Sequence, residues 1–192
     1  MKTACIATIA ATLICAGPAA ARTEPQLPAA AAATTVREAM ARLSFMHGVW
    51  VGPASGVNPD RTAYAVTQTE RIGPMLGGDV LVIEGRGYLP DGSTGFNAFA
   101  VVSYDARAGR YEIRSYTGGM AGTFPLTLTE DGYVWEVRSG PGVMRFTATV
   151  NGDRYEEVGD FVMEGRPPVR SFQMSLARRG DTDWPAAGAV QR

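Results

Sequence analysis

Ten short segments of the chain share one pattern, in which apolar and polar side chains alternate with a period of two residues. The segments lie near residues 48–54, 62–72, 79–89, 94–105, 110–117, 122–130, 133–139, 143–150, 154–164 and 169–178. This alternation is typical of β-strands, because successive side chains point to opposite faces of a sheet. The dipeptides Asp91-Gly92, Asp131-Gly132 and Asn151-Gly152 tolerate the positive φ angles of tight hairpin turns. The pattern therefore predicts antiparallel strands joined by hairpins.

The order of these segments restricts the fold class further. No helical pattern lies between them, which excludes a parallel α/β sheet, and their short connections favour an up-and-down barrel over a Greek-key sandwich. One short helix is predicted before the first strand, N-capped by Thr34 or Thr35 and ending between Ser44 and Gly48. We therefore predict an all-β fold, an antiparallel up-and-down β-barrel of about ten strands with one short N-terminal helix.

The alternation also predicts which side chains line the barrel. Each strand of the second half carries its apolar residues on one face, and a closed sheet must turn that face inward. The predicted interior sets are Tyr111, Ile113 and Ser115; Phe124, Leu126 and Leu128; Tyr133, Trp135 and Val137; Phe146, Ala148 and Val150; Phe172, Met174 and Leu176.

The two ends of the 192-residue chain differ from its middle. Residues 1–21 combine Lys2, an apolar stretch and a small-residue site, which predicts a signal peptide cleaved after Ala21 and an exported, periplasmic or extracellular protein. Lipidation at Cys15 stays open, although Ile14 is not the small residue that lipoprotein signals place there. We expect a flexible leader at 22–34, one domain at 35–179 and a flexible tail at 180–192.

Composition excludes several classes of function. Both cysteines and the only lysine lie in the predicted signal peptide, so the mature chain can form no disulfide, cysteine metal site or lysine Schiff base. A net charge of −1 argues against nucleic-acid binding, which needs concentrated positive charge. We predict no metal, no cofactor and no membrane span in the mature chain. The oligomeric state stays open.

Two acidic residues are candidates for chemistry inside the barrel. Glu70 and Glu84 share the interior face if Val66 and Val82 point inward, and buried carboxyl groups can act as acids or bases. The alternative is that they pair with Arg86, Arg114 or Arg145, or lie on the solvent face. As a ligand site we predict an apolar wall of Tyr111, Trp135, Phe146 and Met174, with Glu70, Glu84 or Arg145 as its polar anchor.

Gly48 and Trp50 at the start of the first strand, with Arg178 at the end of the last, carry a resemblance to a known family. We expect Trp50 to plug the barrel end and stack on Arg178 or Arg179. With the stretches 43–52, 70–78, 103–105, 109–111 and 172–178, these residues resemble the bacterial lipocalin-like proteins of the calycin superfamily. The resemblance implies a barrel with an internal cavity. It implies no haem, because the only histidine is His47 and related haem-binding barrels use one on a late strand.

Three functions follow as hypotheses. The first is an exported barrel that binds a small apolar or amphipathic molecule in its interior. The second is a carboxylate-dependent isomerase or hydrolase that pairs Glu70 with Tyr111 or Glu84. The third is a filled structural barrel that acts through protein partners.

Overall fold

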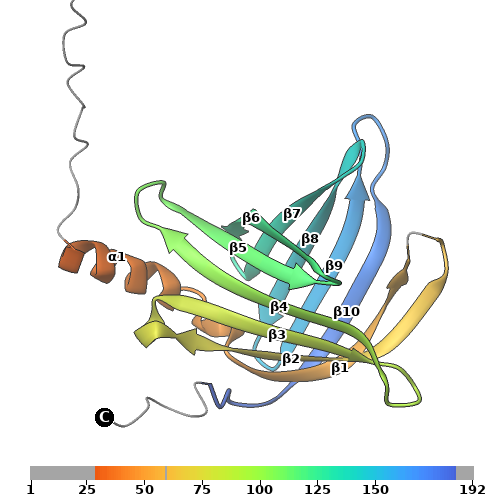
Figure 1. The fold of residues 1–192 in the computed structure, drawn as a ribbon, viewed down its shortest axis with the longest axis horizontal. Coiled ribbons are helices and arrows are strands. Elements are labelled where there is room, and N and C mark those ends of the chain that lie inside the picture. The colour runs from red at the N-terminus through yellow and green to blue at the C-terminus, as the bar shows by residue number, and fades with distance from the viewer. Residues whose placement is uncertain (1–28, 59, 185–192) are drawn as a thin grey trace, which may run out of the picture.

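The protein is a closed barrel of ten antiparallel strands, as predicted (Figure 1). The computed structural model describes residues 29–58 and 60–184. Each strand pairs with the next along the chain, and β1 closes the ring by pairing with β10. The strands are β1 (Gly48–Val57), β2 (Ala63–Met75), β3 (Val80–Tyr88), β4 (Thr94–Asp105), β5 (Arg110–Thr117), β6 (Met120–Leu128), β7 (Gly132–Ser139), β8 (Gly142–Asn151), β9 (Arg154–Val162) and β10 (Val169–Gly180).

The predicted helix exists, but its predicted start was wrong. Helix α1 spans Ala29–Ala41, so Thr34 and Thr35 lie inside it rather than at its N-cap. Alanine has the highest helix propensity, and the alanine run at 29–33 extends the helix toward the N-terminus beyond the threonines. The helix therefore reaches into the segment expected to be a flexible leader.

Helix α1 and the short 3-10 helix η1 (Ser44–Met46) lie at one end of the barrel (Figure 1). Met40, Leu43 and Met46 are buried there and join the barrel core. The Tyr111 hydroxyl donates a hydrogen bond to the carbonyl oxygen of Ala39 at 2.7 Å. These contacts close one end of the barrel, so access to the interior must come from the other.

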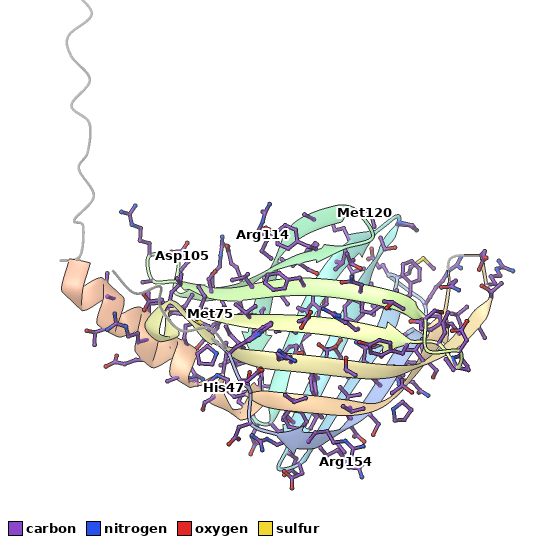
Figure 2. The ribbon with its side chains drawn as sticks, turned by 60° about the horizontal axis from the view of Figure 1, so that its bottom comes forward. His47, Met75, Asp105, Arg114, Met120 and Arg154 are labelled. Carbon is purple, nitrogen blue, oxygen red and sulfur yellow. The ribbon has the colours of Figure 1, made fainter. Side chains whose placement is uncertain are left out.

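The predicted interior faces are confirmed by burial. The core contains the alternate residues of successive strands, whereas charged side chains lie between them on the outside, as Arg114 and Arg154 do in Figure 2. The buried members are Tyr111 and Ile113 on β5, Leu126 on β6, Tyr133 on β7, Ala148 and Val150 on β8, and Met174 and Leu176 on β10. Period-two alternation was therefore sufficient to predict this half of the core.

Gly48, Trp50 and Arg178 meet where β1 pairs with β10, but the predicted stacking of Trp50 on arginine was wrong. Trp50 is fully buried, donates its indole N–H to the carbonyl oxygen of Met46 at 3.0 Å, and meets Tyr155 edge-on at 5.7 Å. The Arg178 guanidinium instead binds Asp181 at 2.5 Å and lies against Gly48. Among the described residues, the ring partner of Trp50 is therefore a tyrosine.

The chain after β10 returns to the outside of the barrel. Residues 181–184 pack on β2, where Arg71 contacts Asp183 at 3.2 Å and lies over the Trp184 ring at 5.8 Å. This part of the predicted flexible tail is thus held by specific contacts. The predicted signal peptide and residues 22–28 of the leader lie outside the described residues. Within the described chain, no helix has the length and apolar character needed to cross a membrane.

Candidate functional site

The barrel interior is not filled. It contains a cavity of about 430 Å³, within the range typical of small-molecule sites. Val57, Phe96 and Phe99 line this cavity and are also exposed, which places its mouth at the end of the barrel opposite α1. The hypothesis of a filled structural barrel is therefore wrong in its physical premise.

An aromatic wall forms one side of the cavity. Trp135 on β7 stacks on Phe146 on β8 with ring centres 4.5 Å apart and an angle of 15° between the rings. Phe172 on β10 meets the edge of Phe146 at 6.2 Å. The two phenylalanines touch across β9 because Gly159 leaves the space, since a Cβ there would lie 3.0 Å from both side chains. Met174 continues this wall, so Trp135, Phe146 and Met174 line the cavity as predicted.

Glu70 lies in the cavity wall as predicted, on the inward face of β2. The Gln68 side-chain amide donates to Glu70 Oε1 at 2.7 Å, and both side chains are buried. Gly85, the neighbour of Glu70 on β3, provides their space, because a Cβ at this position would lie 2.8 Å from Glu70 Oε1. Three residues on two adjacent strands thus build one polar pocket in the wall.

A second carboxyl group in the cavity wall belongs to Glu157, which was not among the residues predicted from the sequence. Tyr133 on β7 donates its hydroxyl to Glu157 Oε2 at 2.9 Å, and the Tyr155 hydroxyl hydrogen-bonds to both Tyr133 and Glu157. All three side chains are buried. The period of two residues in β9 could have predicted this position, because it places Glu157 on the same face of the strand as Tyr155 and Gly159.

Burial dominates the electrostatics of both carboxyl groups. It raises the pKa of Glu70 to about 8, against the opposing effect of the Gln68 hydrogen bond, and the charge of Glu157 adds to the rise. Burial likewise raises the pKa of Glu157 to about 7, although the two tyrosine hydroxyls favour its ionised form. The pKa values of Tyr133 and Tyr155 are raised well above their usual value, again chiefly by burial. Both carboxyl groups can therefore exchange protons near neutral pH.

The interior placement predicted for Glu84 was wrong. Ile83 and Gly85 line the cavity, and the period of two turns Glu84 to the outer face of β3. There it forms an ion pair with Arg86, which is the alternative that the sequence left open. The prediction assumed that Val82 points inward. Glu70 instead lies opposite Gly85 on β3, so Gly85 faces the interior, and Val82 and Glu84 lie on the other face of the strand.

Arg145 and Tyr111 do not reach the cavity either. Arg145 precedes the inward Phe146, lies on the outer face of β8 and binds Glu136 at 2.6 Å. Tyr111 faces the interior as predicted, but at the closed end, where α1 accepts its hydroxyl hydrogen bond. The carboxyl groups that line the cavity are therefore those of Glu70 and Glu157, and the expected pairs of Glu70 with Glu84 or Tyr111 do not form.

Structural comparison places this geometry in a known fold. The chain is similar to the crystal structure of Rv2717c from M. tuberculosis, with a TM-score of 0.56 and 15% identity over 73% of this chain and 97% of that one. It was also matched to the structure of the S-type phycobiliprotein lyase CPES from Guillardia theta, at a TM-score of 0.49 and 12% identity over 82% and 100% of the two chains. No protein-family model and no curated protein matches the sequence.

The likeness to Rv2717c concerns the fold. At 15% identity, a shared barrel says nothing about the residues inside it. The antiparallel ten-stranded barrel is thus supported as a fold, and the function must be argued from the cavity itself. In chemical terms the cavity combines an aromatic wall with two buried carboxyl groups. Across the described residues, no three or more His, Cys, Asp or Glu side chains converge as metal ligands would.

Proposed function

We propose that the barrel binds one small, mostly apolar molecule with a polar end inside its cavity. The observation that carries this proposal is an open cavity that joins a stacked aromatic wall to a buried polar cluster. Apolar area supplies affinity in such a site, whereas a few placed polar groups orient the ligand. Glu70, Trp135, Phe146 and Met174 would contact the ligand together with Glu157, Tyr133 and Tyr155.

Filling the cavity should abolish binding. Ala98 lines the cavity on β4, and Ala98→Phe would place a ring in the space that a ligand needs. We expect this variant to lose at least about tenfold in affinity for the neutral apolar dye Nile red, measured by fluorescence titration. Asn97→Phe is the matched control, because its side chain lies on the exposed outer face of the same strand. Equal dye affinity in both variants would place the binding site outside the cavity.

A second candidate function is proton-transfer catalysis on a bound molecule. It is favoured by the two cavity carboxyl groups, whose pKa values of about 8 and about 7 suit a group that gives and takes protons at neutral pH. An isomerase or hydrolase of this kind would use Glu70 with Glu157 rather than with Glu84. Its signature is turnover of a model ester that Glu70→Gln abolishes while Nile red binding is retained.

We also propose that the protein acts after export. The support is the sequence of residues 1–21, with a basic start, an apolar stretch and a run of alanines before Arg22. N-terminal sequencing of the protein isolated from its cells should begin at Arg22. A chain that retains Met1 would contradict export by this route.

A further inference from the structure

Building on the proposed function, we propose that the polar end of the bound molecule is a protonated amine held between Glu70 and Glu157. The ligand class is then an amphipathic amine, with an apolar body against Trp135 and Phe146 and an ammonium group at the two carboxyl groups. Three features of the described residues lead to this class.

The first feature is the absence of positive charge from the cavity wall. Among the described residues that line the cavity there is no Arg, Lys or His, although two glutamates are present. Arginines that adjoin lining residues in sequence form ion pairs outside the cavity, as Arg71 does with Asp183 and Arg86 does with Glu84. The cavity therefore holds two acids without a counter-charge, an arrangement that disfavours an anionic ligand such as a fatty acid.

The second feature is a free oxygen on each carboxyl group. Gln68 occupies Glu70 Oε1, and the tyrosines occupy Glu157 Oε2. Within the described chain, Glu70 Oε2 and Glu157 Oε1 accept no hydrogen bond, although each residue is only 8% exposed. No fully buried side-chain oxygen or nitrogen among these residues lacks a partner, so both free oxygens must border the cavity. They are acceptors available to a donor on the ligand.

The third feature is the direction of the hydrogen bonds around the carboxyl groups. The Gln68 amide donates to Glu70, the Tyr133 hydroxyl donates to Glu157, and the Tyr155 hydroxyl shares its one proton between Tyr133 and Glu157. Donors placed in this way stabilise the ionised form, and burial opposes them. An ammonium group would supply the missing positive charge, and charge-assisted hydrogen bonds are the stronger kind.

The same groups predict how binding depends on pH. The titratable side chains that face the site are Glu70 and Tyr64 on β2, Tyr133 on β7, and Tyr155 and Glu157 on β9, and the charge of Glu84 on β3 acts on Glu70. The tyrosines stay neutral because their pKa values are raised. Amine binding should therefore release protons from the two glutamates and weaken as the pH falls below about 6, where both are protonated.

Three ligands of equal chain length separate the charge of the polar end from the apolar tail. Decylamine, decanol and decanoic acid are each used to displace Nile red from the full protein at about pH 7.5. We expect decylamine to bind at least about tenfold more tightly than decanol, and decanoic acid to bind more weakly than either. Glu70→Gln and Glu157→Gln should each reduce the preference for the amine. Glu84→Gln and Glu156→Gln, on the outer faces of β3 and β9, should keep it.

The outcomes distinguish this inference from the proposed function. Equal displacement by decanol and decylamine, or an amine preference that survives in both cavity variants, would overturn the amine while leaving the binding function intact. Failure of Nile red and of all three ligands to bind would overturn the binding function itself. Retained Nile red binding by the Gln variants serves as the measure that their barrels are folded.

Discussion

The free energy of unfolding is expected to fall as the pH rises from 4.5 to 8, with a slope of up to about 1.4 kcal/mol per pH unit for each buried glutamate. Glu70 and Glu157 carry this effect, because burial raises their pKa from the usual 4.5 to about 8 and about 7. In that range the folded protein binds more protons than the unfolded chain. Their contribution is complete below pH 4.5 and is lost as the pH rises through the folded pKa values.

The double variant Glu70→Gln, Glu157→Gln tests this directly. Glutamine imitates the protonated acid, so the variant should match the wild type near pH 4.5 and exceed its stability at pH 8 by at least about 3 kcal/mol. Urea unfolding at several pH values, followed by tryptophan fluorescence, provides the measurement. Glu156→Gln, on the exposed outer face of β9, is the control. Parallel curves for wild type and double variant across this range would contradict the raised pKa values.

Other titratable groups make the free energy of unfolding rise with pH. Their contributions are the same in the wild type and the double variant, so they cancel in the difference between the two. Burial lowers the pKa of His47 from 6.5, so its contribution rises with pH up to that value. The turn residues Asp60, Asp91 and Asp105 have pKa values lowered from 3.8 by hydrogen bonds from side chains and backbone, and their contribution is lost only in more acid solution. The difference between wild type and variant therefore isolates the two glutamates.

Gly132→Ala is expected to destabilise the barrel by about 3 kcal/mol or more, which is large for the addition of one methyl group. A Cβ at Gly132 would lie 1.9 Å from the backbone carbonyl oxygen of Ala148. This atom belongs to β8, which pairs with β7 at this point, so the strands themselves would have to move apart. Denaturant unfolding of the variant gives the measurement.

Gly140→Ala is the appropriate comparison. Gly140 occupies the turn between β7 and β8 with φ of 55°, and no atom lies within 4 Å of the position that a Cβ would take, so alanine there meets backbone strain alone. We expect this change to cost about 1 kcal/mol. If Gly132→Ala proved no more destabilising than Gly140→Ala, the close approach of β7 to Ala148 would be wrong. Substitution by alanine is thus expected to cost much more at Gly132, where another strand packs closely, than at the turn residue Gly140, although both glycines lie beside turns in the sequence.

The structural role of Gly132 could not be predicted from the sequence. The sequence predicts a turn glycine of positive φ at Asp131-Gly132, as is found at Gly92 and Gly152 with φ of 82° and 57°. Gly132 instead begins β7 in extended conformation, and glycine is needed there because another strand lies too close. No local pattern encodes the distance to Ala148, which lies in the next strand.

The candidate site divides in the same way. Trp135, Phe146 and Met174 could be predicted because each belongs to a run of alternating apolar residues on one strand. Glu84 was misplaced because the side of β3 that faces inward depends on its register with β2, where Gly85 lies opposite Glu70. Glu157 was overlooked because its partner Tyr133 lies two strands away in the ring.

Alternation and turn residues by themselves determined the number of strands, their antiparallel order and most of the apolar lining, since these properties depend on neighbours within one strand or one hairpin. The tertiary structure alone decided that the interior stays hollow and that Glu70 and Glu157 share it with no positively charged side chain among the described lining residues. Closure of the ring brings together side chains from β2, β7 and β9, and burial then sets their protonation. Both effects arise only when strands distant in sequence surround the same space.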